Sequence, residues 1–105
     1  MRYLVATDAN DPSGLPPFSA GFLREVVLPS LEALVRLESE GKILGGGVRV
    51  GERAITFIVE AESNRELDEL LHDLPFWGIS RMEVTPLQPI EERLEYERRL
   101  AERLA

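Results

Sequence analysis

The order of strand-like and helix-like segments constrains this chain more than any single motif does. Short runs rich in β-branched and aromatic residues occur at 2–7, 42–50, 53–61 and 80–87. Helix-like runs with amphipathic spacing lie between the first and second of these, at 18–40, and between the third and fourth, at 63–74. The β-α-β-β-α-β order predicts a ferredoxin-like α+β subunit, in which two helices cover one face of an antiparallel sheet.

Local residues mark the ends of the predicted helices. Gly41 stands where a helix C-cap needs a positive φ, and Pro29 should kink or divide the first helix near its middle. Ser63 and Glu66 have the spacing of a capping box at the start of the second helix, ahead of a leucine stripe. The Gly-Glu pair at 51–52 suits a tight hairpin between the second and third strands.

The end of the chain is dense in Glu and Arg. Pro89 lies near a helix start, and Glu95 and Arg99 have the spacing of an i,i+4 ion pair. We therefore expect a ferredoxin-like domain at 1–88, followed by a charged, solvated helix at 89–105.

Charge and composition exclude several classes of partner. The 105 residues carry a formal net charge of -7, which would repel nucleic acid and anionic membranes. There is no cysteine, so disulfides, thiol catalysis and thiolate metal sites are excluded. The N-terminal apolar run is too short for a signal peptide or a membrane span, and we expect a cytoplasmic protein.

Strand alternation predicts which side chains lie on each face of the sheet. The set expected to face the helices is Leu44, Val48, Val50, Ile55, Phe57, Val59, Met82 and Val84. The set expected on the uncovered face, called the open face below, is Ile43, Gly45, Gly47, Arg49, Ala54, Thr56, Ile58, Glu60, Arg81, Glu83 and Thr85. A chain of this length cannot leave a large apolar face in water, so a second copy is expected to pack against it as a homodimer.

Three consecutive glycines, Gly45 to Gly47, interrupt the second strand. They do not match the dinucleotide-binding fingerprint, because its third glycine is replaced by Val50 and the segment leads into a hairpin instead of a helix. Two interpretations remain open. The glycines mark a β-bulge or a close approach of backbones, or they leave space for a ligand.

Glu60 and Glu83 are the best acid/base candidates on the open face. Burial between two copies would raise a carboxyl pKa, whereas Arg49 or Arg81 alongside would lower it. A structural Arg–Glu network that fixes the dimer is the competing interpretation. His72 is the only histidine, either a base near carboxylates or an exposed residue off the leucine stripe. With one His and no Cys, no metal-ligand spacing appears.

The segment "LHDLPFWGISRMEVTPL", residues 71–87, resembles the C-terminal half of muconolactone delta-isomerases. The matching residues are Leu74-Pro75-Phe76-Trp77 and the strand Glu83 to Leu87, and the "SEGKI" turn at 39–43 aligns without gaps. The resemblance covers about residues 20–88. It implies a ferredoxin-like subunit of a dimeric α+β barrel, often in higher oligomers, which moves a proton along a small unsaturated lactone in aromatic catabolism without cofactor or metal.

Two functional hypotheses follow from the residues and the resemblance. In the first, the chain is a cofactor-free isomerase acting on a small lactone or aromatic-derived acid. Its expected site on the open face comprises Glu83 or Glu60 as base, Arg49 or Arg81 for the substrate anion, Trp77 as a wall, and Thr56, Gly45 and Gly47 around the ligand. In the second, the chain is a non-catalytic ligand-binding or assembly module, since residues 43–48 lack the bulky Trp, Arg and His side chains of the resembled isomerases.

Overall fold

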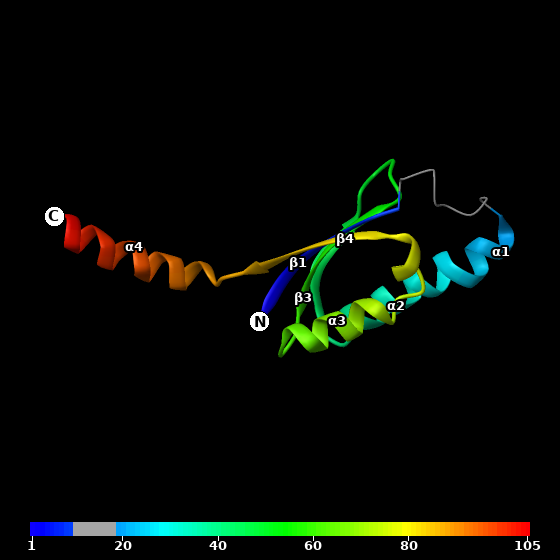
Figure 1. Cartoon of the computed structure of the whole chain (residues 1–105), viewed down its shortest axis with the longest axis horizontal. Helices are drawn as coiled ribbons and strands as arrows, with labels where there is room; N and C mark the ends of the chain where they lie inside the picture. Colours follow the sequence, from blue (N-terminus) through cyan, green and yellow to red (C-terminus); the bar gives the residue numbers. More distant parts are fainter. Residues whose placement is uncertain (10–18) are drawn as a thin grey trace.

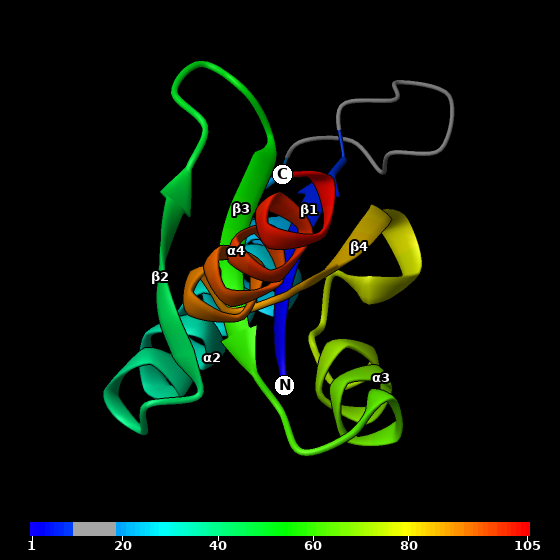
Figure 2. The ribbon, with the colours of Figure 1, turned by 90° about the vertical axis from the view of Figure 1, so that its left-hand side faces the viewer.

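A computed structural model describes residues 1–9 and 19–105. Its sheet has the strand order β2-β3-β1-β4, and every neighbouring pair is antiparallel. The strands are β1 (Arg2–Asp8), β2 (Ile43–Val48), β3 (Ala54–Glu60) and β4 (Arg81–Leu87). Figure 2 shows the four strands side by side in this order, with α2 (Leu28–Ser39) and α3 (Asn64–His72) on one face. The ferredoxin-like α+β prediction is therefore confirmed.

The first helical segment contains a wide turn before its proline. It comprises α1 (Ala20–Phe22), a π-helical turn (Leu23–Val27) and α2 (Leu28–Ser39). The Leu28 N–H bonds to the Leu23 carbonyl five residues back. Pro29 has no N–H for the Glu25 carbonyl and its ring would clash there, so the wide turn accommodates it without breaking the helix. The predicted helix start and the preceding turn-rich loop lie largely outside the described residues.

The second helix begins as its sequence predicts and ends two residues earlier, at His72. In α3 (Asn64–His72), the Ser63 hydroxyl accepts the Glu66 N–H at 3.1 Å, and the Glu66 carboxylate accepts the Glu62 N–H at 2.9 Å. These bonds satisfy two backbone donors at the helix start. A 3-10 turn, η2 (Trp77–Ile79), follows and leads into β4.

The core lies between the sheet and helices α2 and α3. Tyr3, Val5, Phe57 and Val59 from the two central strands are buried, and the leucine stripe of α3 packs on them. Val5 and Val59 are fully buried, each contributing about 1.5–3 kcal/mol relative to an exposed side chain. The helix-facing set predicted for β3 is confirmed, although Ile55 is only partly buried.

The face predicted for Ile43 is wrong, because β2 contains a bulge. Ile43 pairs with Val59 and is 5% exposed in the core, whereas Gly45 pairs with Ile58. The extra residue is Leu44, which was predicted to face the helices and is instead exposed. A bulge shifts the alternation by one residue, which strict counting along the strand cannot anticipate.

The hairpin between β2 and β3 is longer than predicted. Residues 49–53 connect the strands in place of a two-residue turn, and Gly51 has a φ of 82°. Val50, predicted to face the helices, lies in this connection and is 100% exposed. Val48 does lie on the helix side, since it pairs with Ile55.

The last helix, α4 (Ile90–Leu104), buries none of its side chains. Figure 1 shows it extending away from the sheet beyond the end of β4, which gives the molecule its 63 Å longest dimension. The predicted Glu95–Arg99 ion pair is present, with 3.7 Å between the charged groups. In the part of the chain that the structure describes, no helix is long and apolar enough to cross a membrane.

Candidate functional site

The open face brings together part of the predicted site. Glu83 of β4, Ala6 of β1, Thr56 of β3 and Gly47 of β2 form one row across the sheet. Glu83 and Thr56 are two strands apart, about 10 Å, because neighbouring strands are about 4.8 Å apart. The short side chain of Ala6 lies between them. The row therefore has a carboxylate and a hydroxyl on either side of one small side chain.

The neighbouring rows add one cation and a second glycine. In the next row in one direction, Arg81 of β4 lies opposite Asp8 of β1 in the strand register. In the next row in the other direction, Gly45 of β2 lies opposite Ile58 of β3. Within the described ranges, neither Glu83 nor Arg81 makes an ion pair or a side-chain hydrogen bond. Both side chains are exposed in the single chain.

Glu60 and Arg49 lie apart from this cluster. Glu60 is at the other end of β3, where its carboxylate accepts a hydrogen bond from Arg2 Nε at 3.1 Å. It lies four residues along the strand direction and two strands across from Glu83, roughly 16 Å away. Arg49 lies in the β2–β3 connection and pairs with Glu52 at 3.0 Å. Glu60 and Glu83 therefore cannot act on one small molecule within this chain.

Trp77 and His72 form a separate exposed pair. Their ring centroids are 4.3 Å apart and tilted by 46°. His72 is exposed, consistent with its position off the leucine stripe. Trp77 is 43% exposed and lies beside α3, so it walls no space on the open face of this chain.

The three glycines have two different roles. Gly46 has a φ of 133°, and a Cβ there would lie 2.3 Å from the Thr56 carbonyl oxygen. Gly45 and Gly47 have nothing within 4 Å of a Cβ position. The close approach of two backbones therefore explains Gly46, while Gly45 and Gly47 leave open space on the sheet.

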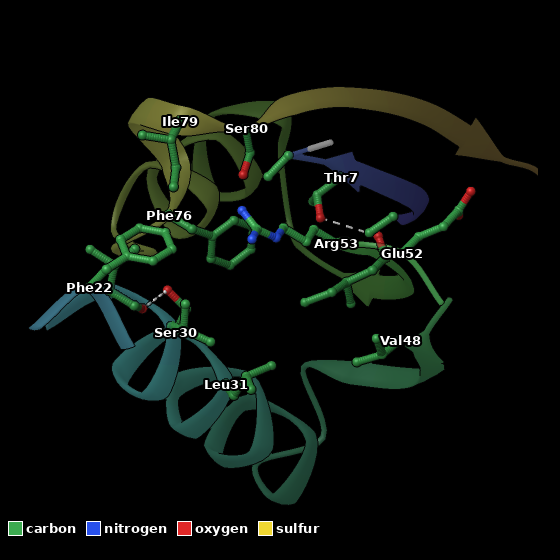
Figure 3. Close-up of a pocket in the computed structure, with 15 residues that line it drawn as sticks. Thr7, Phe22, Ser30, Leu31, Val48, Glu52, Arg53, Phe76, Ile79 and Ser80 are labelled. Atoms are coloured by element: carbon green, nitrogen blue, oxygen red, sulfur yellow. Dashed lines mark hydrogen bonds between the residues drawn. The ribbon is translucent and has the colours of Figure 1, made fainter. Parts of the chain in front are cut away.

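A cavity lies on the other face of the sheet, where the sequence predicts no site. It has a volume of about 240 Å³ and lies between the sheet, the π-helical turn with the start of α2, and the η2 turn. Figure 3 shows its residues converging from these elements. Its apolar lining includes Phe22, Val26, Leu31, Val48, Ile55, Phe76 and Ile79. We call this space the helix-side cavity.

Three hydroxyl groups line the helix-side cavity, and two of them have backbone partners. Thr7 donates to the Ile55 carbonyl at 3.3 Å, and Ser30 donates to the Val26 carbonyl at 2.6 Å. The Ser80 Oγ is buried and has no hydrogen-bond partner in the described part of the chain. Buried polar groups are nearly always paired, so Ser80 needs a further explanation.

Two charged residues lie at the edge of this cavity. Figure 3 shows the Arg53 side chain extending from the start of β3 toward Phe76 and Ser80. The Glu52 side chain points away from the interior in the same view, and its carboxylate pairs with Arg49. The cavity can therefore hold a small ring that is mostly apolar and carries a few polar atoms. The Arg53 side chain provides a cation at one edge of the cavity. No cluster of acidic or histidine residues suited to a metal ion occurs within residues 1–9 and 19–105.

Comparison with known proteins identifies the family. The model of the family described as muconolactone delta-isomerase matches residues 1–92. A crystal structure of muconolactone isomerase superposes with a TM-score of 0.72 at 20% identity, covering 85% of this chain and 90% of that one. A structure of 5-chloro-2-hydroxyhydroquinone dehydrochlorinase from Burkholderia phenoliruptrix AC1100, in complex with 2,5-dihydroxybenzoquinone, gives a TM-score of 0.57 at 22% identity, covering 84% and 94%. A search of the curated proteins found no match. Since the family match covers most of its length, the chain belongs to the muconolactone delta-isomerase family.

Proposed function

We propose that this chain is a cofactor-free, proton-transferring isomerase that binds a small unsaturated lactone or aromatic-derived ring acid in the helix-side cavity. The main observation in support is the cavity itself, which has an apolar lining, an unpaired buried hydroxyl and an arginine at its edge. Small-molecule sites are typically apolar hollows with a few convergent polar groups. The family assignment supports this type of reaction, and the cavity is our candidate place for the substrate.

The size of the cavity suits one small ring. Sites for drug-sized ligands are about 300–1,000 Å³, and this cavity has about 240 Å³. Two similar structures belong to enzymes of small oxygenated rings, a muconolactone isomerase and a dehydrochlorinase that holds 2,5-dihydroxybenzoquinone. A ring of that size with a carboxylate or ring oxygens fits the same limit.

The proposed reaction neither oxidises nor reduces the substrate. A base removes a proton from a ring carbon next to the C=C bond, the double bond shifts, and a proton returns to another carbon of the same molecule. Arg53 would hold the substrate carboxylate at the cavity edge, because a guanidinium pairs well with a carboxylate. Glu52 is a carboxylate among the residues that line the cavity and is our candidate base, after its exposed side chain turns from Arg49 toward the cavity.

The first experiment measures muconolactone isomerisation by proton NMR in D₂O, where exchange at the reacting carbons also becomes visible. We expect Glu52→Gln to abolish turnover while muconolactone still raises the melting temperature, because binding to the folded state alone stabilises it. The matched control is Glu32→Gln, a charge-neutralising change on the exposed side of α2. Full activity of Glu52→Gln would remove Glu52 from the mechanism.

Glu83 on the open face is the competing base. If a second copy packs there, the row containing Glu83, Ala6 and Thr56 becomes enclosed, and Arg81 or the partner's groups could hold the substrate anion. Glu83→Gln then abolishes turnover, while Glu52→Gln and Arg53→Gln keep it. The opposite pattern supports the helix-side cavity, so the three variants together separate the two placements.

The non-catalytic alternative has one observation in its favour. No carboxylate among the described residues is directed into the helix-side cavity, since Glu52 points outward. In that case the protein binds a ring compound without turning it over, and α4 serves assembly with other copies. Stabilisation by muconolactone with no exchange in D₂O would support this alternative. We propose a cytoplasmic location and a role in aromatic breakdown for either version.

A further inference from the structure

Ser80 is a buried hydroxyl that the fold does not use. It lies between the η2 turn and β4, its Oγ is inaccessible to solvent, and it has no partner among the described residues. Figure 3 shows this hydroxyl pointing toward the interior of the helix-side cavity. We infer that Ser80 recognises an oxygen substituent on the ring of the bound ligand. This inference rests on the proposed use of the helix-side cavity as the binding site.

The other two hydroxyls of the cavity are less suited to this role. A serine or threonine hydroxyl has one proton to donate. Thr7 gives its proton to the Ile55 carbonyl, and Ser30 gives its proton to the Val26 carbonyl. Among the three hydroxyls, only that of Ser80 has no acceptor in the described chain, so it alone of the three can donate to a ligand without breaking an existing bond.

Because the Ser80 hydroxyl has no hydrogen-bond partner in the described chain, it favours ligands that carry an acceptor oxygen. A ring without oxygen would leave this hydroxyl without a hydrogen-bond partner, as it already is in the described chain without a ligand. A ring with a hydroxyl or carbonyl oxygen at that position pairs it. Sites that hydrogen-bond a ligand oxygen reject analogues that lack it far better than apolar pockets distinguish sizes. The expected ligand is therefore an oxygenated ring that is apolar on its remaining edges.

Phenol and toluene test this inference because they have nearly the same size and differ at one substituent. Dissociation constants are measured by NMR titration of the full chain, following the backbone amides of the cavity residues. We expect Ser80→Ala to raise the ratio of the phenol Kd to the toluene Kd about tenfold, the effect of losing one buried hydrogen bond. Ser30→Ala is the matched control. It removes a hydroxyl from the same cavity whose proton is already donated to the backbone, so the ratio should stay within twofold of wild type.

The outcomes separate this inference from the proposed function. Binding of both probes in the cavity with an unchanged ratio in Ser80→Ala would overturn the role of Ser80 and leave the cavity as the site. The same would follow if Ser30→Ala changed the ratio equally. Amide shifts confined to residues outside the cavity, for both probes, would overturn the cavity as a binding site together with Ser80.

Discussion

Replacing Gly46 by alanine tests how the glycine triplet is used. The added Cβ would lie 2.3 Å from the Thr56 oxygen and 2.5 Å from the Phe57 Cα, and neither backbone atom can rotate aside as a side chain could. The φ of 133° adds about 1–3 kcal/mol of backbone strain for an L-residue. Forcing the two strands apart adds about 1–3 kcal/mol, as overpacking in a core does. We expect Gly46→Ala to lower the free energy of unfolding by about 2–6 kcal/mol.

Gly47→Ala is the matched control in the same strand. Its Cβ would meet nothing within 4 Å, and the loss of glycine freedom in the unfolded chain should change stability by about 0.4–1 kcal/mol in the stabilising direction. Urea unfolding followed by circular dichroism measures both variants. In a domain of this size, a change of about 1 kcal/mol in the free energy of unfolding shifts the melting temperature by about 4–8 °C. The explanation of the triplet is wrong if the free energy of unfolding of Gly46→Ala lies within about 0.5 kcal/mol of the wild-type value. It is also wrong if Gly47→Ala is destabilised as much as Gly46→Ala.

Two further predictions concern the helices. A chain ending at Gln88 should keep its melting temperature within about 3 °C, because α4 buries no side chain, and loss of cooperative unfolding would contradict a separate domain at 1–88. Ser63→Ala should lower the free energy of unfolding, measured in urea, by about 1 kcal/mol, because it removes the acceptor of the Glu66 N–H. Ser63→Asp keeps a side-chain acceptor at this position and should lose little stability. Equal effects of the two changes would refute the capping role.

Elements whose ends are fixed by local chemistry could be predicted from the sequence. Ser63 and Glu66 mark the start of α3 through hydrogen bonds within a few residues, and Gly41 ends α2 with a φ of 79°. The ferredoxin-like fold class followed from the succession of strand-like and helix-like segments, because few arrangements bury the apolar faces of such a chain. The face of β2 could not be predicted in full, since the bulge at Leu44 depends on pairing with β3, a partner distant in sequence.

The candidate site was only partly predictable for the same reason. Alternation placed Glu83, Arg81, Thr56 and the two open-space glycines on one face, and the strand register agrees. It gave no distance along the strands, so Glu60 was grouped with residues far from it. The helix-side cavity was missed because its lining comes from elements scattered along the chain with no characteristic spacing. The one available signal was Ser30, a hydroxyl on the apolar side of a helix.

The π-helical turn at Leu23–Val27 holds one residue more than an α-helical turn over the same span. Deleting one residue there would rotate everything before it by about 100° around the helix axis. Phe22 would swing away from the cavity, while Ser30 and the rest of α2 would keep their places on the sheet. A one-residue insertion or deletion can therefore reshape this pocket in other chains of the fold and leave every contact of the central strands intact.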